Sequence, residues 1–128
     1  MTQSNAMIMS FIAGEAITER YCVIQDPDNA DKVLLPTADN MKCIGFADDA
    51  QATAGLHVAV HTSGGYRLAV ADGDITKDDL LICADGGKVK TDPATGSTTS
   101  YIVGQALEDG TDGNQIRILV RFQIKYNA

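Results

Sequence analysis

The sequence is poor in residues that build helices and large aromatic cores. It has no tryptophan and three prolines, and aromatic residues make up 5% of the chain. Only three of its seventeen acidic residues are glutamate, a helix former; the other fourteen are aspartate, which favours turns and caps. Together with twelve glycines, this composition predicts a turn-rich β protein.

Basic clusters and paired cysteines are also missing. Ten basic against seventeen acidic residues leave a net charge of −7, which argues against nucleic acid as the main ligand. Cys22, Cys43 and Cys83 are widely spaced without a C-x-x-C pair, so we expect reduced, partly buried thiols and no disulfide framework or zinc site. The start of the chain lacks signal-peptide features and no apolar run is long enough to span a bilayer, which predicts folding in a cytoplasm.

Patterns that carry catalysis, cofactor binding or metal binding are absent from the sequence. His57 and His61 are four residues apart, but in a strand their side chains lie roughly 13 Å from each other, too far to share a zinc ion. We expect both on a solvent-exposed face. The segments at 26–31 and 72–79 resemble calcium loops without the glycine and glutamate that such loops need. We therefore predict a protein that is not an enzyme, with no catalytic, cofactor-binding or metal-binding residues.

Short apolar runs alternate with turn signals every 8 to 12 residues, a rhythm typical of a small barrel or sandwich. Two turns, 63–65 and 85–87, are predicted to be tight hairpins. Residues 1–13 show no clear period and are expected to form an extended N-terminal arm, followed by a single β domain over 14–128. The predicted strands are 21–25, 32–36, 43–47, 56–62, 66–71, 80–84, 88–91, 101–106 and 115–126.

The last predicted strand, 115–126, has apolar residues at every even position, and period two places these against a core. Arg117, Arg121 and Lys125 make its other face basic. A strand of this length spans roughly 40 Å, more than the roughly 36 Å width of a compact domain of this size. We predict that its end at Tyr126, together with the basic face, contacts a neighbouring subunit. A curved barrel strand with a solvated face is the alternative.

One segment of the sequence is repeated, in altered form, later in the chain. Residues 43–60 resemble residues 102–119: Gly45 corresponds to Gly104 and Ala47 to Ala106. Glycines inside strands allow another backbone to approach closely. The sequence thus predicts two pseudo-repeated β units packed on each other, unless a common hairpin pattern has occurred twice by chance.

Lys42, in the stretch NMKC, resembles the hairpin lysine that biotinyl and lipoyl carrier domains modify. Those domains also consist of two β repeats. The residues flanking Lys42 do not match that family's motif. A carrier domain modified at Lys42 is the alternative function.

The order and spacing of four segments resemble another family more closely. They are GEAITERYCVI (14–24), CIGFADDAQATAGLHVAVHTSG (43–64), LAVADGDITKDDLLICADGGKVKT (68–91) and YIVGQALEDGTDGNQIRILV (101–120). In this respect the chain is similar to the small capsid decoration, or cement, proteins of tailed bacteriophages. The resemblance implies a β-barrel or β-tulip body that forms a homotrimer and binds outside the expanded capsid, where it clamps major capsid subunits together.

The resemblance also implies a location on the virion exterior after synthesis in the bacterial cytoplasm. The unanchored N-terminal arm is the best candidate for the contact with the major capsid protein, because an extended segment can add as a strand to a capsid sheet. The residues predicted to make this contact are Met7, Ile8, Met9, Phe11 and Ile12.

Overall fold

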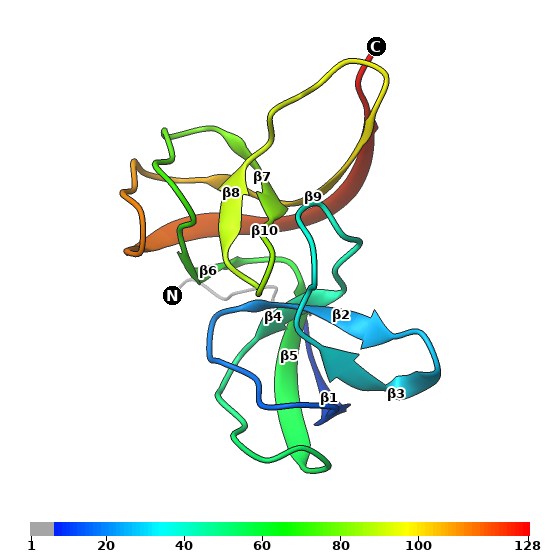
Figure 1. Ribbon diagram of the computed structural model, residues 1–128. Coiled ribbons are helices and arrows are strands. Elements are labelled where there is room, and N and C mark those ends of the chain that lie inside the picture. The colour runs from blue at the N-terminus through cyan, green and yellow to red at the C-terminus, as the bar shows by residue number, and fades with distance from the viewer. Residues whose placement is uncertain (1–6) are drawn as a thin grey trace.

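The computed structural model describes residues 7–128, which form ten β-strands in two five-stranded sheets (Figure 1). These residues contain no helix, and so none that could cross a membrane. The mainly β prediction is confirmed. The strands are β1 (Met7–Ala13), β2 (Cys22–Asp26), β3 (Asn29–Leu34), β4 (Gly45–Ala47), β5 (His57–Ser63), β6 (Tyr66–Val70), β7 (Leu80–Cys83), β8 (Val89–Thr91), β9 (Thr99–Ala106) and β10 (Gln115–Tyr126).

The first sheet closes into a barrel with the strand order β1-β3-β2-β4-β5. Parallel pairing of β1 with β3 and antiparallel pairing of β1 with β5 close it. The second sheet has the order β6-β10-β9-β7-β8, and a single bridge between Ala71 and Val89 joins its two edges. Figure 1 shows the first sheet in the lower half of the molecule and the second above it.

The predicted internal repeat is confirmed and extends over almost the whole fold, because equivalent backbone bonds recur in both sheets. The amide of Arg20 donates to the carbonyl of Ala47 at 2.9 Å, as the amide of Asp78 donates to Ala106 at 2.9 Å. Arg20 and Asp78 both adopt a left-handed backbone, with φ of 71° and 76°. Strands β1 to β5 therefore correspond in order to β6 to β10.

Gly45 and Gly104 occupy the same position in the two repeats. A Cβ atom added at Gly45 would lie 2.6 Å from the carbonyl oxygen of His61, and one added at Gly104 would lie 2.6 Å from that of Leu119. Both separations are far below van der Waals contact. The close backbone approach predicted for these glycines is present twice.

The apolar core has two parts. The smaller one fills the first barrel with Ala13, Ile17, Val23, Val33, Ala47, Val58 and Val60. The larger one fills the second sheet and continues across the joint, where Cys22, Ile24, Cys43 and Phe46 of the first repeat pack against it. The larger part of the core therefore spans the joint and packs the two repeats against each other.

Residues 7–13, expected as part of a free arm, form a barrel strand. β1 pairs with β5 from Met7 to Ile12 and with β3 at Ile12 and Ala13. Phe11 packs against the core of the first barrel. The expected boundary at residue 13 is thus corrected, because β1 is the strand that closes the barrel. Residues 1–6 of the expected arm lie outside the described residues.

The two predicted hairpin turns have different outcomes. The turn at 85–87 does join paired strands, since Cys83 of β7 lies opposite Val89 of β8. The prediction for 63–65 is wrong, because β5 and β6 belong to different sheets. Gly64 and Gly65, both at positive φ, instead carry the chain from the first barrel into the second sheet.

Candidate interaction surfaces

The three cysteines form a buried group at the joint between the repeats, and all are free thiols, as predicted. Contact with the Cys22 thiol and burial raise the pKa of Cys43. Contact with Cys43 and burial likewise raise the pKa of Cys83. The raised pKa values keep the thiols of Cys43 and Cys83 protonated at neutral pH, so these two thiols lack the character of nucleophiles. Within residues 7–128, no group of three or more His, Cys, Asp or Glu side chains could hold a metal ion.

The two histidines have different environments. His57 is exposed and its Nδ1 lies 3.1 Å from Ser10 Oγ. His61 is buried, which corrects the prediction that both face solvent. Its Nε2–H donates to the carbonyl of Gly64 at 2.6 Å, and its Nδ1 accepts from Arg67 Nη1 at 3.2 Å. Strand β6 and the segment that links the two repeats cover this side of β5. The alternation of side chains along β5 could not reveal this cover.

Arg67 is the polar centre of the joint between the repeats. Its guanidinium lies 3.0 Å from Asp48 Oδ1 and donates to the carbonyl of Ala47 at 3.2 Å. The side chain is 10% exposed, so these bonds to the first repeat are largely shielded from water. Arg67 therefore holds the two repeats in a fixed relation.

The ends of β9 and β10 form a two-stranded extension, which we call the ribbon (residues 99–102 and 123–126). Tyr101 lies opposite Ile124 and Thr99 opposite Tyr126. In Figure 1 these strand ends curve away from the first barrel, with the C-terminus near the tip. The prediction of a strand over 115–126 is confirmed, and the ribbon shows where its end leaves the body of the second sheet.

A bulge at the base of the ribbon reverses the faces of β10. Val120 lies opposite Gly104, but Gln123 lies opposite Ile102, so one residue of β9 faces two of β10. Opposite residues in an antiparallel pair point to the same side. The even-numbered residues of the ribbon consequently point to the face opposite to that of Val120. The prediction that every even residue packs against one core is wrong beyond this bulge.

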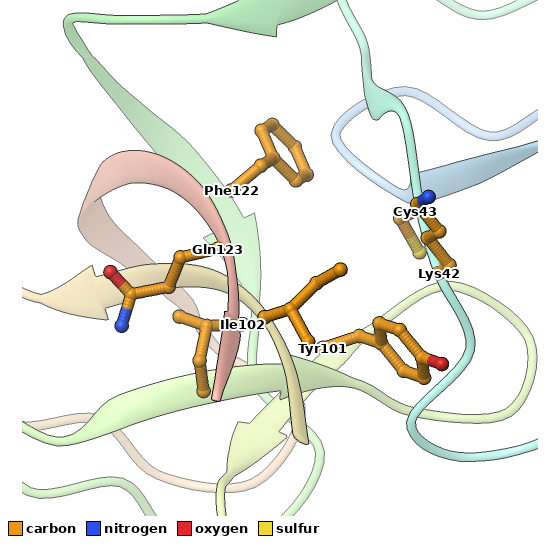
Figure 2. A pocket seen from close by; sticks show the side chains of 7 residues that line it. Lys42, Cys43, Tyr101, Ile102, Phe122 and Gln123 are labelled. Carbon is orange, nitrogen blue, oxygen red and sulfur yellow. The ribbon is translucent and has the colours of Figure 1, made fainter. Parts of the chain in front are cut away.

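The outward face of the ribbon is apolar and borders a hollow. Ile124 is 54% and Tyr126 83% exposed. A hollow of about 380 Å³ lies beside them, lined by Lys42, Cys43, Tyr101, Ile102, Phe122, Gln123 and Ile124. In Figure 2, the side chains of Phe122 and Tyr101 extend toward the loop that carries Lys42, and that of Gln123 extends away from it. The Phe122 ring, 6.0 Å from that of Phe46, anchors the base of the ribbon.

The basic residues predicted to form a subunit contact are mostly paired within the chain. Arg117 lies 3.3 Å from Glu108, and Lys125 lies 3.0 Å from Asp92, whose side chain is buried. Among the ion pairs of residues 7–128 none includes Arg121, which is exposed. The charge of the predicted basic face is therefore largely neutralised within the chain. Of the four residues predicted for the subunit contact, Arg121 is exposed outside an ion pair and Tyr126 is exposed.

Asp92 fixes the ribbon to the preceding loop. Burial works to raise its pKa, but hydrogen bonds from Ser100, from the amide of Ala94 and from Lys125 outweigh burial and hold the pKa below its usual range. The carboxylate is thus charged at neutral pH. It ties both strands of the ribbon, through Ser100 and Lys125, to one buried group.

A second exposed apolar surface lies on β1. Met7, Ile8 and Met9 are all exposed, and Ile8 lines a shallow hollow of about 480 Å³ together with the exposed Tyr66 of β6. Phe11 and Ile12, predicted with them as contact residues, are half-buried in the barrel. The five predicted residues therefore divide into three that a partner can reach directly and two that support the barrel.

Exposed apolar strands beside shallow hollows are suited to binding other proteins. A family model described as phage cement protein matches residues 3–122. The chain belongs to the phage cement protein family. No curated protein matches it significantly.

The fold of this cement protein is shared with a solved phage structure, the N base of head fiber gp8.5 in bacteriophage phi29. The two chains are 15% identical, the alignment covers 91% of this chain and 94% of that one, and the TM-score is 0.70. At this level of identity the likeness concerns the fold. The resemblance found from the sequence is confirmed at the level of the family.

Sequence reasoning did not identify three side chains on these surfaces as contact candidates: Tyr66, Tyr101 and Phe122. Phe122 belongs to the even-numbered apolar series that was assigned to the core. Tyr66 and Tyr101 are the first residues of predicted strands, where an aromatic residue is equally common in a core. The signal that marks them is their position in the lining of a hollow, which depends on how the two repeats pack.

Proposed function

We propose that this cement protein binds the outer surface of the expanded phage capsid and stabilises contacts between neighbouring major capsid subunits. The observation that carries the proposal, beyond family membership, is the exposed apolar surface of Met7, Ile8 and Met9 beside Tyr66. We assign the capsid contact to this surface, with Phe11 and Ile12 holding its strand in place. No catalytic residue is assigned, because the role requires none.

The mechanism is thermodynamic linkage. A protein that binds the expanded shell and not its ruptured parts stabilises the shell in proportion to the logarithm of its concentration over its dissociation constant. We further propose a homotrimer, and we assign Arg121 and Tyr126 to a contact between copies of the chain. Once one subunit of a trimer has bound, the other subunits are held near their binding sites at a high effective concentration. Weak individual contacts therefore give a high overall affinity.

Co-sedimentation with empty expanded heads, and with unexpanded heads for comparison, tests the proposal. We expect binding to expanded heads only and a rise in the temperature at which they rupture. Ile8→Asp should weaken binding about tenfold, as for a residue at the centre of an interface. Leu56→Asp is the matched control, because Leu56 is 53% and Ile8 52% exposed. Equal binding by both variants would place the contact elsewhere, and no binding by the natural chain would refute the proposal.

The carrier alternative is not favoured by the position of Lys42. This lysine is exposed on the loop of residues 35–44 between β3 and β4, and not at the tip of a tight hairpin. An intact mass without a biotinyl or lipoyl addition on protein from its natural host would exclude this alternative.

A further inference from the structure

The outer edge of β10 has no strand beside it within the ribbon. β6 pairs with β10 only as far as Leu119, and the amide of Val120 then donates to the carbonyl of Gly65. From Arg121 to Tyr126, the backbone pairing of β10 within residues 7–128 is with β9 alone. Exposed strand edges readily pair with another strand and are usually covered or protected. This edge carries no proline and has one charged side chain, Arg121, outside an ion pair.

We propose that this edge binds the same edge of a second copy, so that two ribbons pair antiparallel about a two-fold axis centred on Ile124. The inference rests on the proposed function only in one respect, namely that on the capsid the paired ribbons would join neighbouring trimers. The pairing itself is a property of the isolated protein. A two-fold contact of this kind uses the same surface on both copies. If one residue contacts a second residue of the other copy, the second residue contacts the first in the same way.

The register follows from charge and from the faces of the strand. In a two-fold antiparallel pair, opposite residues must lie on the same face, so the centre falls on a single residue. Centring on Lys125 would oppose two lysines, and centring on Gln123 would oppose Arg121 to Lys125. Like charges directly opposite each other are destabilising. Of the three centres within residues 123–125, only Ile124 avoids both clashes.

The Ile124 register also joins apolar side chains. Ile124 lies opposite its own copy, and Phe122 lies opposite Tyr126 of the second copy, while Lys125 meets Gln123. Cross-strand pairs of aromatic and β-branched residues stabilise sheets. Phe122 and Ile124 both line the hollow of about 380 Å³, so pairing would extend the apolar surface around it and cover Ile124 and Tyr126, the most exposed apolar side chains of the ribbon.

Charge exchange at Ile124 tests the symmetry directly. Ile124→Lys alone and Ile124→Glu alone should each weaken self-association about tenfold, or about 1.4 kcal/mol, in sedimentation experiments across a dilution series. An equimolar mixture should recover association, because lysine then faces glutamate. Leu56→Lys, at almost the same exposure, should leave association unchanged. If mixing restores nothing, residue 124 does not face itself and the two-fold pairing is refuted.

A crosslinking experiment fixes the register. The three natural cysteines are buried, so Ile124→Cys adds an accessible thiol that should form a covalent dimer under mild oxidation with diamide. Leu56→Cys should not. Equal crosslinking of the two variants, or a natural chain that stays a single copy throughout the dilution series, would overturn the inference.

One result would identify another occupant of the edge. If a chain beginning at Met7 associates and crosslinks through position 124 while the full chain does not, residues 1–6 cover the edge and the proposal of a second copy fails. Capsid binding is measured separately on expanded heads. If the natural chain binds expanded heads but does not pair, the pairing is refuted and the proposed function stands. If it pairs but does not bind expanded heads, the proposed function is refuted and the pairing stands.

Discussion

The two repeats of this cement protein share their backbone bonds but differ in the surroundings of their last strand. In the first repeat, β5 ends at Ser63 and the chain passes through Gly64 and Gly65 into β6, which pairs with β10. In the second repeat, β10 continues to Tyr126, and from Arg121 onward it pairs only with the end of β9. The same position in the repeat thus leads into a strand of the next sheet once and forms an exposed ribbon once.

The comparison shows how a repeated unit acquires a binding surface. After the first repeat, the chain continues into a second repeat that packs on it, and this packing covers side chains such as Arg67 in the joint. Within residues 7–128, no third repeat covers the residues that continue the second. A repeat unit buries one face against its neighbour, so the end of such an array exposes what its interior hides.

Removing residues 1–13 should have the largest effect on this comparison. We expect the first barrel to lose its closure, because β1 pairs along β5 and with β3, while the second sheet has no equivalent pairing with β1. Hydrogen exchange should show lost protection in β5 and retained protection in β9 and β10. A chain beginning at Met7 is the control and should keep both. Retained protection in β5 without residues 1–13 would show that the barrel does not depend on β1.

Gly45→Ala and Gly104→Ala probe the equivalence of the repeats. Each added Cβ would meet a backbone carbonyl oxygen at 2.6 Å, so each variant should lose about 1–3 kcal/mol of unfolding free energy, in the range of overpacked sites. Urea unfolding measures the loss. Gly96→Ala serves as control, because a Cβ atom added there would lie no closer than 3.2 Å to its nearest neighbour. A large loss at only one of the two glycines would show that the strand pairs are not equivalent.

Asp92→Asn should have a smaller effect, confined to the ribbon. Losing charge-assisted bonds to Ser100 and Lys125 should cost about 1–2 kcal/mol at pH 7. Because the pKa of Asp92 is lowered in the fold, its contribution is present above the unfolded value near 3.8 and disappears as the pH falls through the folded value.

The variant should therefore differ from the natural chain at neutral pH and approach it in acid. Urea unfolding from pH 7 to pH 2 measures this difference. A difference independent of pH would mean that the lost stability is due to packing and not to the carboxylate charge.

Much of the fold could be read from local patterns. The strand over 115–126, the hairpin at 85–87 and the correspondence of Gly45 with Gly104 result from alternation, turn residues and glycine spacing. Each of these depends on neighbours in sequence or on one strand pair. The barrel strand β1 was missed because Met7 to Ser10 remain exposed, so the strand lacks the alternation that marks its counterparts.

The candidate surfaces were predictable only in part. Sequence reasoning placed contact residues on Met7 to Met9 and on Tyr126, which are exposed, but it could not separate them from Phe11 and Ile12, which support the barrel. It also counted Arg117 and Lys125 as available, although Glu108 and Asp92 hold them. Which charges remain free depends on partners distant in the chain.

The sequence by itself determined the class of fold, the repeat and the family, because composition, period and motif order are properties of the chain. Tertiary structure alone decided which faces are covered. The bulge after Val120 turns the apolar side of β10 outward, and the packing of one repeat on the other buries His61 and Arg67. Burial depends on what lies across the sheet, and alternation along a strand carries no information about that neighbour.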